Sequence, residues 1–419
     1  MTSARRLLDD CFLHDKDRLR HDEVLALLKE RLAPIASVRN LPLEQAHRLV
    51  LAEDVTAPRN IPAHTNAAVD GYAVRAADLN PDGMTRLKVA ERITAGDTRD
   101  LALEEGAGAR IFTGARMPVG ADTVFMQEDC ESDGKTVELP SGIKPGANVR
   151  AAGEDFAAGS IVAHAGARLR PQELAAIAAT GQDQVACYAP LSVALMSTGD
   201  EVLQPGAEFK TGQVYDSNRF LLRALLETVN VTINDLGIVS DDEATVRRTI
   251  LEASASHDVI LTTGGASRGE EDHIVSVMAS EGNLHAWQLA VKPGRPLAFG
   301  QIGDTVFLGL PGNPVAAFVC FLFYAQPMFA YLQGAAWQAP RRFPLPAAFA
   351  IPKKKPDRRE FWRAWTEDGK AHKFARDGSG LISGLTAATG LIEVPEEVTS
   401  VEKGQMVSFI PFSEFGFAH

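Results

Sequence analysis

The stretch ILTTGGASRGEEDHI, residues 260–274, places a Gly-Gly pair at the end of an apolar run, with three carboxylates just behind it. A glycine-containing turn that opens a helix presents unpaired backbone N–H groups, which favour an anion such as phosphate. Carboxylates beside a phosphate would repel it unless a hard cation such as Mg²⁺ bridges the two. Taken alone, the stretch is also typical of an ordinary turn with helix capping.

Three further apolar runs end in loops of related character. The loops are STGDE at 197–201, SDD at 240–242 and PGNP at 311–314. In open α/β sheets ligands collect at the carboxyl ends of the strands, so the four loops are interpreted together. Two contain glycine turns and two are acidic, and this combination predicts a metal-phosphate site at one sheet edge.

Basic residues offer a counterpart to an anionic ligand. In AVKPGRPLAFG, residues 290–300, Lys292 and Arg295 flank a Pro-Gly turn. The basic stretch KKKPDRREFWR, residues 353–363, is typical of a solvated turn and strand edge, with Arg363 directed inward behind two aromatic residues. The Asp70-Gly71 pair is a turn signal by itself, and so are the glycine turns in FTGARMP and NVRAAGEDF.

From about residue 188, short apolar runs alternate with helical patterns of 10 to 15 residues over some 140 residues. This alternation predicts a central, doubly wound α/β domain with a mostly parallel sheet covered on both faces. Ser240 with Glu243 forms a capping box pattern, and Asn313 before a proline is typical of a helix start. The apolar run 315–325 is shorter than a membrane span and precedes Gln-Pro, which predicts a buried helix that ends there.

The remaining segments predict additional domains. Helical periodicity at 22–32 and 41–55 predicts two helices, and a third helix at 171–181 ends at the C′ glycine Gly181. Between 58 and 157 short β-branched runs cut by Gly and Pro predict a β-rich domain. From 340 to 419, short runs including REFWRAW and GLISGL predict a small barrel or sandwich.

Composition narrows the class of protein. The chain of 419 residues is long enough for two to four domains, and its net charge of −12 argues against nucleic acid and anionic membranes as partners. The cysteines at 11, 130, 187 and 320 have no metal-ligand spacing and no disulfide pattern, which favours a reducing cytoplasm. The first residues lack the apolar core of a signal peptide.

Seven motifs, taken in order and spacing, resemble the molybdopterin molybdenumtransferase family, which includes bacterial MoeA and the C-terminal domain of gephyrin. They are NAAVDGYAV, IFTGARMPVGADTV, VRAAGEDF, STGDEV, TTGGASRGEEDH, LAVKPGRPLAFG and GLPGNPVAAF. The resemblance covers the chain after about residue 20, and the run from KPGRPLAFG to GLPGNP is highly specific.

The resemblance implies a chain with an N-terminal extension at 1–20 and four parts. These are a linking domain at 21–57 and 158–187, an inserted β-rich domain at 58–157, a central molybdopterin adenylyltransferase-like α/β domain at 188–335, and a C-terminal β barrel at 340–419. It implies a homodimer whose active cleft lies between the central domain of one subunit and the inserted domain of the other. Other proteins of molybdenum cofactor biosynthesis are further implied partners.

The implied reaction takes adenylylated molybdopterin and molybdate, cleaves the pyrophosphate bond with Mg²⁺, and releases AMP and molybdenum cofactor. By resemblance, the acidic residues of the metal and nucleotide region are Glu201, Asp241 and Asp272. The loops of Gly264-Gly265 and Gly312-Asn313 would hold the molybdopterin phosphate, with Arg295 in the binding turn. Molybdate would meet Lys292, Ser267, Arg363 and Ser379. From the partner subunit, the cleft would gain Asp70, Thr113, Arg150, Glu154 and Asp155.

Three departures from the family pattern affect the cleft. In GGASRG, an alanine replaces the usual valine after the two glycines, and Arg268 is added. Gln288 stands in place of a lysine. Arg150 is followed by two alanines, where bacterial relatives often have further arginines. Losing one charged contact costs about 1.5 to 3 kcal/mol. Two alternatives therefore stay open: a divergent paralogue that binds molybdopterin or nucleotide without inserting metal, and a dimeric scaffold protein.

Overall fold

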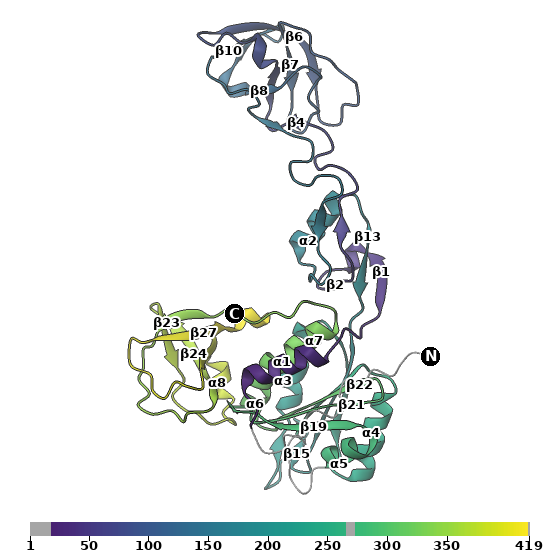
Figure 1. Ribbon diagram of the computed structural model, residues 1–419, viewed down its shortest axis with the longest axis vertical. Coiled ribbons are helices and arrows are strands. Elements are labelled where there is room, and N and C mark those ends of the chain that lie inside the picture. The colour runs from purple at the N-terminus through teal and green to yellow at the C-terminus, as the bar shows by residue number, and fades with distance from the viewer. Residues whose placement is uncertain (1–17, 265–272, 418–419) are drawn as a thin grey trace.

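The computed structural model describes residues 18–264 and 273–417. Figure 1 shows an elongated molecule with a β domain at the top, a small linking domain in the middle, and an α/β domain beside a C-terminal β domain at the bottom. The first helix belongs to the bottom part, so the chain travels up to the inserted β domain and returns before it builds the central sheet.

The central domain is built on a six-stranded sheet in the order β17-β14-β18-β22-β21-β19. Its strands are β14 (Ser192–Thr198), β17 (Thr232–Val239), β18 (Val259–Thr263), β19 (Asn283–Gln288), β21 (Pro296–Ile302) and β22 (Thr305–Leu310). The first four strands in this order pair in parallel, whereas β21 is antiparallel to both of its neighbours. The predicted mostly parallel sheet is confirmed.

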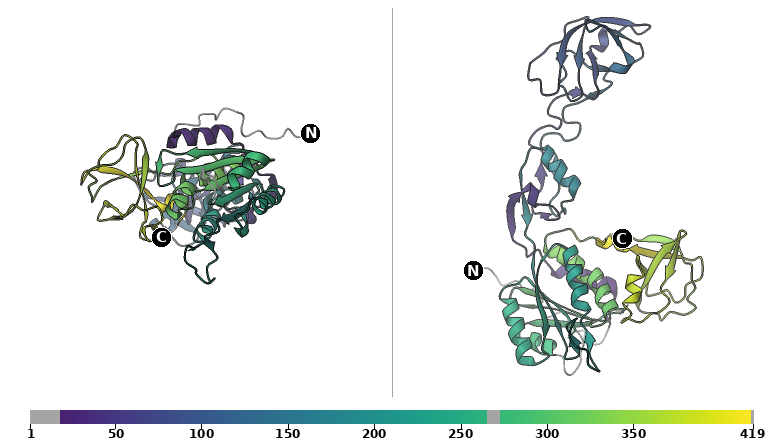
Figure 2. Two further views of the ribbon diagram at one scale, coloured as in Figure 1. Left: turned by 90° about the horizontal axis from the view of Figure 1, so that it is seen from below. Right: turned by 180° about the vertical axis from the view of Figure 1, so that it is seen from behind.

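Alternation along each buried strand sends side chains to two separate cores. Leu195 and Leu261 pack on one face, whereas Ala194 and Ile260 pack on the other. The first face is covered by α1 (His21–Arg31), α3 (Asn218–Thr228), α6 (Pro314–Cys320) and α7 (Gln326–Leu332). The second face is covered by α4 (Glu243–Ser254) and α5 (His273–Glu281). Figure 2 shows helices on both sides of the sheet, as the doubly wound pattern predicts.

The most apolar helix runs from Pro314 to Leu332 and is 78% buried over its most apolar window. Its middle is a π-helical turn, η4 (Phe321–Ala325), between α6 and α7. Its length and composition would suit a membrane, but it lies in the core, as predicted. The prediction that it ends at Gln326 is wrong, because proline fits the first turn of α7 without breaking the run.

The linking domain contains a three-stranded sheet, β1-β13-β2, a two-stranded ribbon of β3 with β12, and one helix. Its elements are β1 (Val38–Pro42), η1 (Leu43–Gln45), β2 (Val50–Leu51), β3 (Val55–Thr56), β12 (Ile161–Ala163), α2 (Pro171–Ala179) and β13 (Gln184–Tyr188). The predicted C′ glycine, Gly181, follows α2 with φ +83°. The predicted helix at 41–55 is wrong, since this segment forms β1 to β3.

The inserted domain confirms the predicted β-rich character of 58–157. It has a six-stranded sheet, β8-β5-β7-β6-β10-β9, and a short ribbon of β4 with β11. Its strands are β4 (Asn66–Ala67), β5 (Gly71–Val74), β6 (Thr85–Ile93), β7 (Ala107–Ile111), β8 (Thr123–Met126), β9 (Glu131–Ser132), β10 (Thr136–Leu139) and β11 (Val149–Arg150). Figure 1 places β4 at the end that faces the linking domain.

The C-terminal domain forms a curled sheet in the order β20-β24-β26-β27-β23, and β25 also pairs with β24. Its strands are β20 (Val291–Lys292), β23 (Phe343–Pro346), β24 (Arg359–Glu367), β25 (Lys370–Lys373), β26 (Gly390–Val394) and β27 (Met406–Pro411). A bridge between Ala347 and Ala371 brings the β23 edge back to β25, which closes the predicted small barrel. The run GLISGL, residues 380–385, is not a strand, and the short helix α8 (Ser383–Thr386) begins within it.

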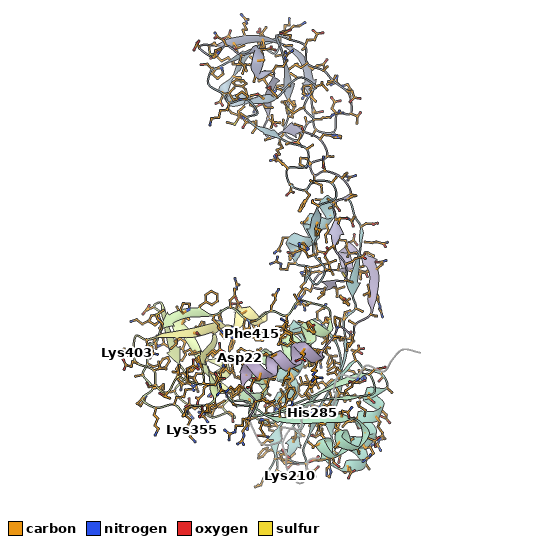
Figure 3. All side chains as sticks on the ribbon, in the orientation of Figure 1. Asp22, Lys210, His285, Lys355, Lys403 and Phe415 are labelled. Carbon is orange, nitrogen blue, oxygen red and sulfur yellow. The ribbon has the colours of Figure 1, made fainter. Side chains whose placement is uncertain are left out.

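The basic stretch 353–363 is more buried than the solvated turn that was predicted. Lys354 is 4% exposed and donates hydrogen bonds to the carbonyl oxygens of Arg358 and Pro395. Arg359 forms ion pairs with Glu393 in the barrel and with Asp22 on α1. This pairing ties α1 to the C-terminal domain, and Figure 3 shows Asp22 lying between the two.

Candidate active site

Two glycine loops meet at the carboxyl edge of the central sheet. Gly264 follows β18 with φ +84°, and a Cβ built on Gly312, after β22, would lie 4.0 Å from the Gly264 Cα. The Asn218 side chain donates hydrogen bonds of 2.7 Å both to the Gly312 carbonyl and to the Thr263 hydroxyl. One buried amide on α3 therefore holds the two loops together, and the two loops lie at one sheet edge as predicted.

The two acidic loops lie at the same edge, on the β14 and β17 strands. Asp200 accepts a hydrogen bond of 3.4 Å from the backbone N–H of Asp241, which joins the loops. The Glu201 carboxylate folds back over Gly199, where an added methyl group would lie 2.7 Å from it. The N-cap of α4 is Asp242, which accepts from the Thr245 N–H, so the predicted capping box of Ser240 with Glu243 is wrong.

Three predicted site residues, Gly265, Ser267 and Asp272, lie outside the described residues. Within 18–264 and 273–417, no three His, Cys, Asp or Glu side chains gather at metal-binding distance. The predicted metal set of Glu201, Asp241 and Asp272 includes one of these undescribed residues, so it stays a prediction.

The turn that carries Lys292 and Arg295 lies at the same edge, because it joins β19 to β21. Its residues Val291 and Lys292 form β20, which pairs in parallel with β24 of the C-terminal barrel. The run HAWQLAV, residues 285–291, is therefore divided between two sheets. Gly294, with φ +114°, packs on Cys320 so closely that a Cβ would lie 2.7 Å from the Sγ atom. The turn is thus fixed from beneath by the core helix.

Lys292 lines a cationic pocket between the central domain and the barrel. The pocket is lined by Lys292, Pro293, Val315, Phe361, Trp362, Arg363, Lys373, Phe374, Arg376 and Asp377. Arg363 is 5% exposed and points inward, as predicted. Its guanidinium donates to the carbonyl oxygens of Leu381 and Arg376. Burial lowers the pKa of Arg363, yet the group stays charged, so the pocket carries several cations in a partly desolvated space.

The cationic pocket and the glycine loops are joined by the start of α6. Asn313 is the N-cap of this helix, with Pro314 in its first turn, as predicted. Val315, which lines the pocket, donates its backbone N–H to the Ser379 carbonyl at 3.0 Å. Ser379 is thereby held beside the loop of Gly312, so the pocket is adjacent to the sheet edge.

In the inserted domain, two predicted residues form one hydrogen-bonded pair. Asp70 accepts from the Thr113 hydroxyl at 2.6 Å and from its backbone N–H at 2.8 Å. The Thr113 hydroxyl and then its N–H lower the pKa of the Asp70 carboxyl, because both donate hydrogen bonds to its ionised form. The pair presents an exposed, oriented carboxylate, rather than the plain Asp-Gly turn that the sequence alone indicates.

The other predicted residues of this domain lie near the ribbon of β4 and β11. Arg150 is the last residue of β11 and pairs with Asn66. The Glu154 carboxylate accepts from the backbone N–H of Ala151 at 2.9 Å, and Asp155 is held by its own N–H on the Ile61 carbonyl. This turn lies at the end of the inserted domain that faces the rest of the chain.

Within one chain, the two groups of predicted residues are not brought together. Figure 1 shows β4, β7 and β8 at the far end of the molecule from β19, β21 and β22. The linking domain separates them. A site that uses both groups would need the inserted domain of a second chain.

Sequence reasoning missed several residues of this site. Lys373, Arg376 and Asp377 line the cationic pocket, and Asn218 holds the glycine loops. Lys373, Arg376 and Asp377 follow no motif and reach the pocket only because β24 pairs with β20 and β25. Asn218 opens a predicted helix after a strand, and a polar first-turn residue there is the only signal that the sequence offered.

Comparison with protein families assigns all the major parts of the chain. Residues 19–181 match the MoeA N-terminal region (domain I and II), 194–331 match a probable molybdopterin binding domain, and 344–412 match the MoeA C-terminal region (domain IV). The fold and these matches define the class of protein as an enzyme of molybdenum cofactor biosynthesis with a molybdopterin-type central domain.

Whole-chain relatives narrow this class. The molybdopterin molybdenumtransferase of Haemophilus influenzae is 36% identical over 94% of this chain and 98% of its own. Molybdopterin molybdenumtransferase 2 of Mycobacterium tuberculosis is 32% identical over 92% of this chain and 96% of its own. The crystal structure of the molybdopterin biosynthesis moeA protein from Pyrococcus horikoshii OT3 is similar with a TM-score of 0.81 and 30% identity, covering 94% of this chain and all of that one. The chain belongs to the molybdopterin molybdenumtransferase family.

Proposed function

We propose that this protein inserts molybdenum into molybdopterin, using adenylylated molybdopterin and molybdate as substrates and releasing AMP as the pyrophosphate bond is cleaved. The observation that carries the proposal is that the glycine loops at Gly264 and Gly312 lie next to the cationic pocket of Lys292, with the start of α6 between them. A phosphate bound at the loops and an oxyanion bound in the pocket would be neighbours. Such positioning supplies much of the rate enhancement in phosphoryl chemistry.

Each part of the site has a distinct task in this proposal. The backbone N–H groups of the glycine loops bind the phosphate of molybdopterin, because Gly264 and Gly312 leave room for close approach. Lys292 and Arg363, with Ser379 beside α6, attract and orient the molybdate dianion. The pyrophosphate then lies toward the acidic loops, at the far side of the glycine turns.

The acidic loops fit a magnesium ion by the chemistry of their donors. Carboxylate oxygens are ligands that Mg²⁺ prefers, and the hydrogen bond from the Asp241 N–H to Asp200 holds two such loops together. Glu201 and Asp241 would hold the ion together with Asp272. Once bound, Mg²⁺ would neutralise pyrophosphate charge and polarise the scissile phosphoryl group.

We further propose that the protein acts as a cytoplasmic homodimer, with each cleft built from the central domain of one subunit and the inserted domain of the other. The support is the separation of the two residue groups within one chain. Asp70, oriented by the two hydrogen bonds from Thr113, would then face the anion site of the partner, with Arg150, Glu154 and Asp155 around it. A carboxylate there is suited to positioning the metal-bound substrate or a water molecule.

The test is a reconstituted reaction of purified protein with adenylylated molybdopterin, Mg²⁺ and molybdate. AMP release is followed by chromatography, and cofactor formation by activation of a molybdoenzyme lacking its cofactor. Wild-type protein is expected to give both products. Lys292→Met is expected to lose cofactor formation by about 100-fold, since one oriented charge contributes about 2.7 kcal/mol or more. The matched control Lys403→Met removes an exposed lysine at the outer end of the barrel and should leave both products unchanged (Figure 3).

Two outcomes would favour the alternatives. AMP release with no molybdenum bound to the dithiolene would indicate a paralogue that does not insert the metal. Tight binding of partner peptides without turnover would indicate a scaffold.

The shared cleft has its own test, based on mixed dimers. Asp70→Asn and Lys292→Met subunits are each expected to be inactive alone. After mixing and subunit exchange, one cleft of every heterodimer regains both native residues, so activity should return to about a quarter of the wild-type value for random pairing. No recovery, with exchange shown by mass spectrometry, would contradict a cleft that spans two subunits.

A further inference from the structure

The cationic pocket holds more positive charge than its surroundings balance. Lys292, Arg363, Lys373 and Arg376 all line it, and Asp377 is the only carboxylate among the lining residues that the structure describes. Arg363 and Lys373 are also largely removed from solvent, with side-chain exposure of 8% for Lys373. Charges in such a space need a counter-ion close by.

Asp377 lies where that counter-ion would act. One carboxylate oxygen is 2.5 Å from the Lys373 ammonium, and the other is 3.9 Å from the Lys292 ammonium. The lysine that the proposed function assigns to molybdate therefore already faces a protein carboxylate. Lys373 is further oriented by the Phe374 carbonyl at 3.1 Å and lies over the Trp362 ring.

A second carboxylate near Lys292 differs from Asp377 in how it is held. Glu360 lies 3.8 Å from Lys292, but its side chain is only 4% exposed and also accepts from the Trp362 indole N–H and pairs with Arg358. Glu360 is thus held in a fixed position beside Lys292, outside the pocket lining. Asp377 is 52% exposed and forms ion pairs with Lys292 and Lys373. It can turn toward solvent by rotating one short side chain.

We propose that Asp377 is a built-in counter-ion of the molybdate pocket, which occupies the cationic centre in the ligand-free protein and must be displaced by the incoming oxyanion. The inference rests on the proposed function, because it takes this pocket as the molybdate site. It adds a residue that sets the affinity of the site. It also names an internal competitor, since a carboxylate and a tetrahedral oxyanion seek the same donors.

The consequence for binding follows from population arithmetic. If the pocket is open in only about 10 to 30% of molecules, the apparent Kd for an oxyanion is raised by about three- to tenfold. The factor is the same for every tetrahedral dianion, because the carboxylate leaves before any of them binds. Such a device keeps the lysines paired when the oxyanion is scarce, and leaves the pocket responsive to its concentration.

Calorimetric titration of the full-length protein with sodium molybdate and with sodium sulfate, at constant ionic strength, tests the proposal. Asp377→Asn keeps the shape of the side chain and removes its charge. The matched control, Asp368→Asn, removes one exposed charge from the turn between β24 and β25 of the same barrel, outside the pocket. Asp377→Asn is expected to bind both oxyanions three- to tenfold more tightly than wild-type protein, and Asp368→Asn to bind them as wild-type protein does.

The possible contrary results are distinct. Equal or weaker oxyanion binding by Asp377→Asn would overturn the proposal, because the carboxylate would then position the lysines rather than compete for them. A gain for molybdate without a gain for sulfate would also overturn it, since displacement acts on both. The titration needs neither molybdopterin nor turnover. A protein that fails the transferase assay but shows the shared gain would therefore refute the proposed function and leave this inference standing.

Discussion

Replacing Gly264 by alanine tests the close contact between the first glycine loop and the end of strand β14. Gly264 has φ +84°, and a Cβ there would lie 2.9 Å from the carbonyl oxygen of Thr198. That oxygen belongs to the last residue of β14, which is held by parallel pairing to strands on both sides. Neither partner can move aside without disturbing the sheet.

The cost has two parts. An alanine in the left-handed region costs about 1 kcal/mol relative to glycine. Overlap with a fixed backbone atom adds about 1 to 3 kcal/mol. We expect Gly264→Ala to lose about 2 to 4 kcal/mol of stability in the central domain, or to release the strain by shifting the loop. A shifted loop would misplace the phosphate, and a misplacement of about 1 Å costs about 100-fold in turnover.

The assay compares urea unfolding and cofactor formation for Gly264→Ala with a matched variant, Gly303→Ala. Gly303 lies in the β21–β22 turn with φ +57°, and its added Cβ would meet nothing within 4 Å. The control should lose no more than about 1 kcal/mol and keep its activity. If Gly264→Ala has the same urea stability and the same rate of cofactor formation as Gly303→Ala, the contact with Thr198 does not constrain Gly264.

Two further predictions concern buried charge at the junction of the domains. Lys354→Met should destabilise the C-terminal barrel by about 1 to 3 kcal/mol, because it removes a buried ammonium that donates hydrogen bonds to several backbone carbonyls. Thermal unfolding measures this loss against the exposed control Lys355→Met (Figure 3). Equal melting temperatures of the two variants would contradict the prediction. Burial lowers the pKa of His21 from 6.5 to about 4. Between pH 4 and 6.5 the unfolded chain therefore binds a proton at His21 that the folded chain does not bind. Stability should therefore be full above about pH 6.5 and fall by up to roughly 3 kcal/mol as the pH drops toward 4. In His21→Gln this fall in the free energy of unfolding between pH 6.5 and 4, measured by urea unfolding, should be absent. An unchanged fall would show that His21 does not cause it.

The central domain was predictable because its inner strands are buried on both faces and its strands alternate with amphipathic helices. Such strands appear as continuous apolar runs, and the four loops that follow them share an edge by topology alone. The Asn313 helix start was also local information. Sequence reasoning therefore located Gly264, Gly312 and the acidic loops at one edge.

Long-range pairing explains most of what was not predictable. The segment 41–55 has a helical period, but β1 pairs with β13, which lies more than 140 residues further along the chain, and Arg48 takes φ +69°, which no helix allows. The cationic pocket depends on β20 joining the barrel through β24. Within GLISGL, Gly384 packs on the Arg363 guanidinium so closely that a Cβ would lie 2.6 Å from it, and the segment turns into α8 instead of a strand.

In the proposed site, the acidic loops lie beside backbone amides that bind phosphate, and this arrangement requires a divalent ion and a polyanion to bind there together. A crystal structure of the protein with AMP, molybdate and Mn²⁺ in place of Mg²⁺, located by anomalous scattering, examines this directly. We expect the metal on the carboxylates of Glu201 and Asp241, phosphate oxygens at the Gly264 and Gly312 amides, and molybdate beside Lys292. Metal and phosphate bound elsewhere, with those carboxylates turned to solvent, would contradict the proposed site.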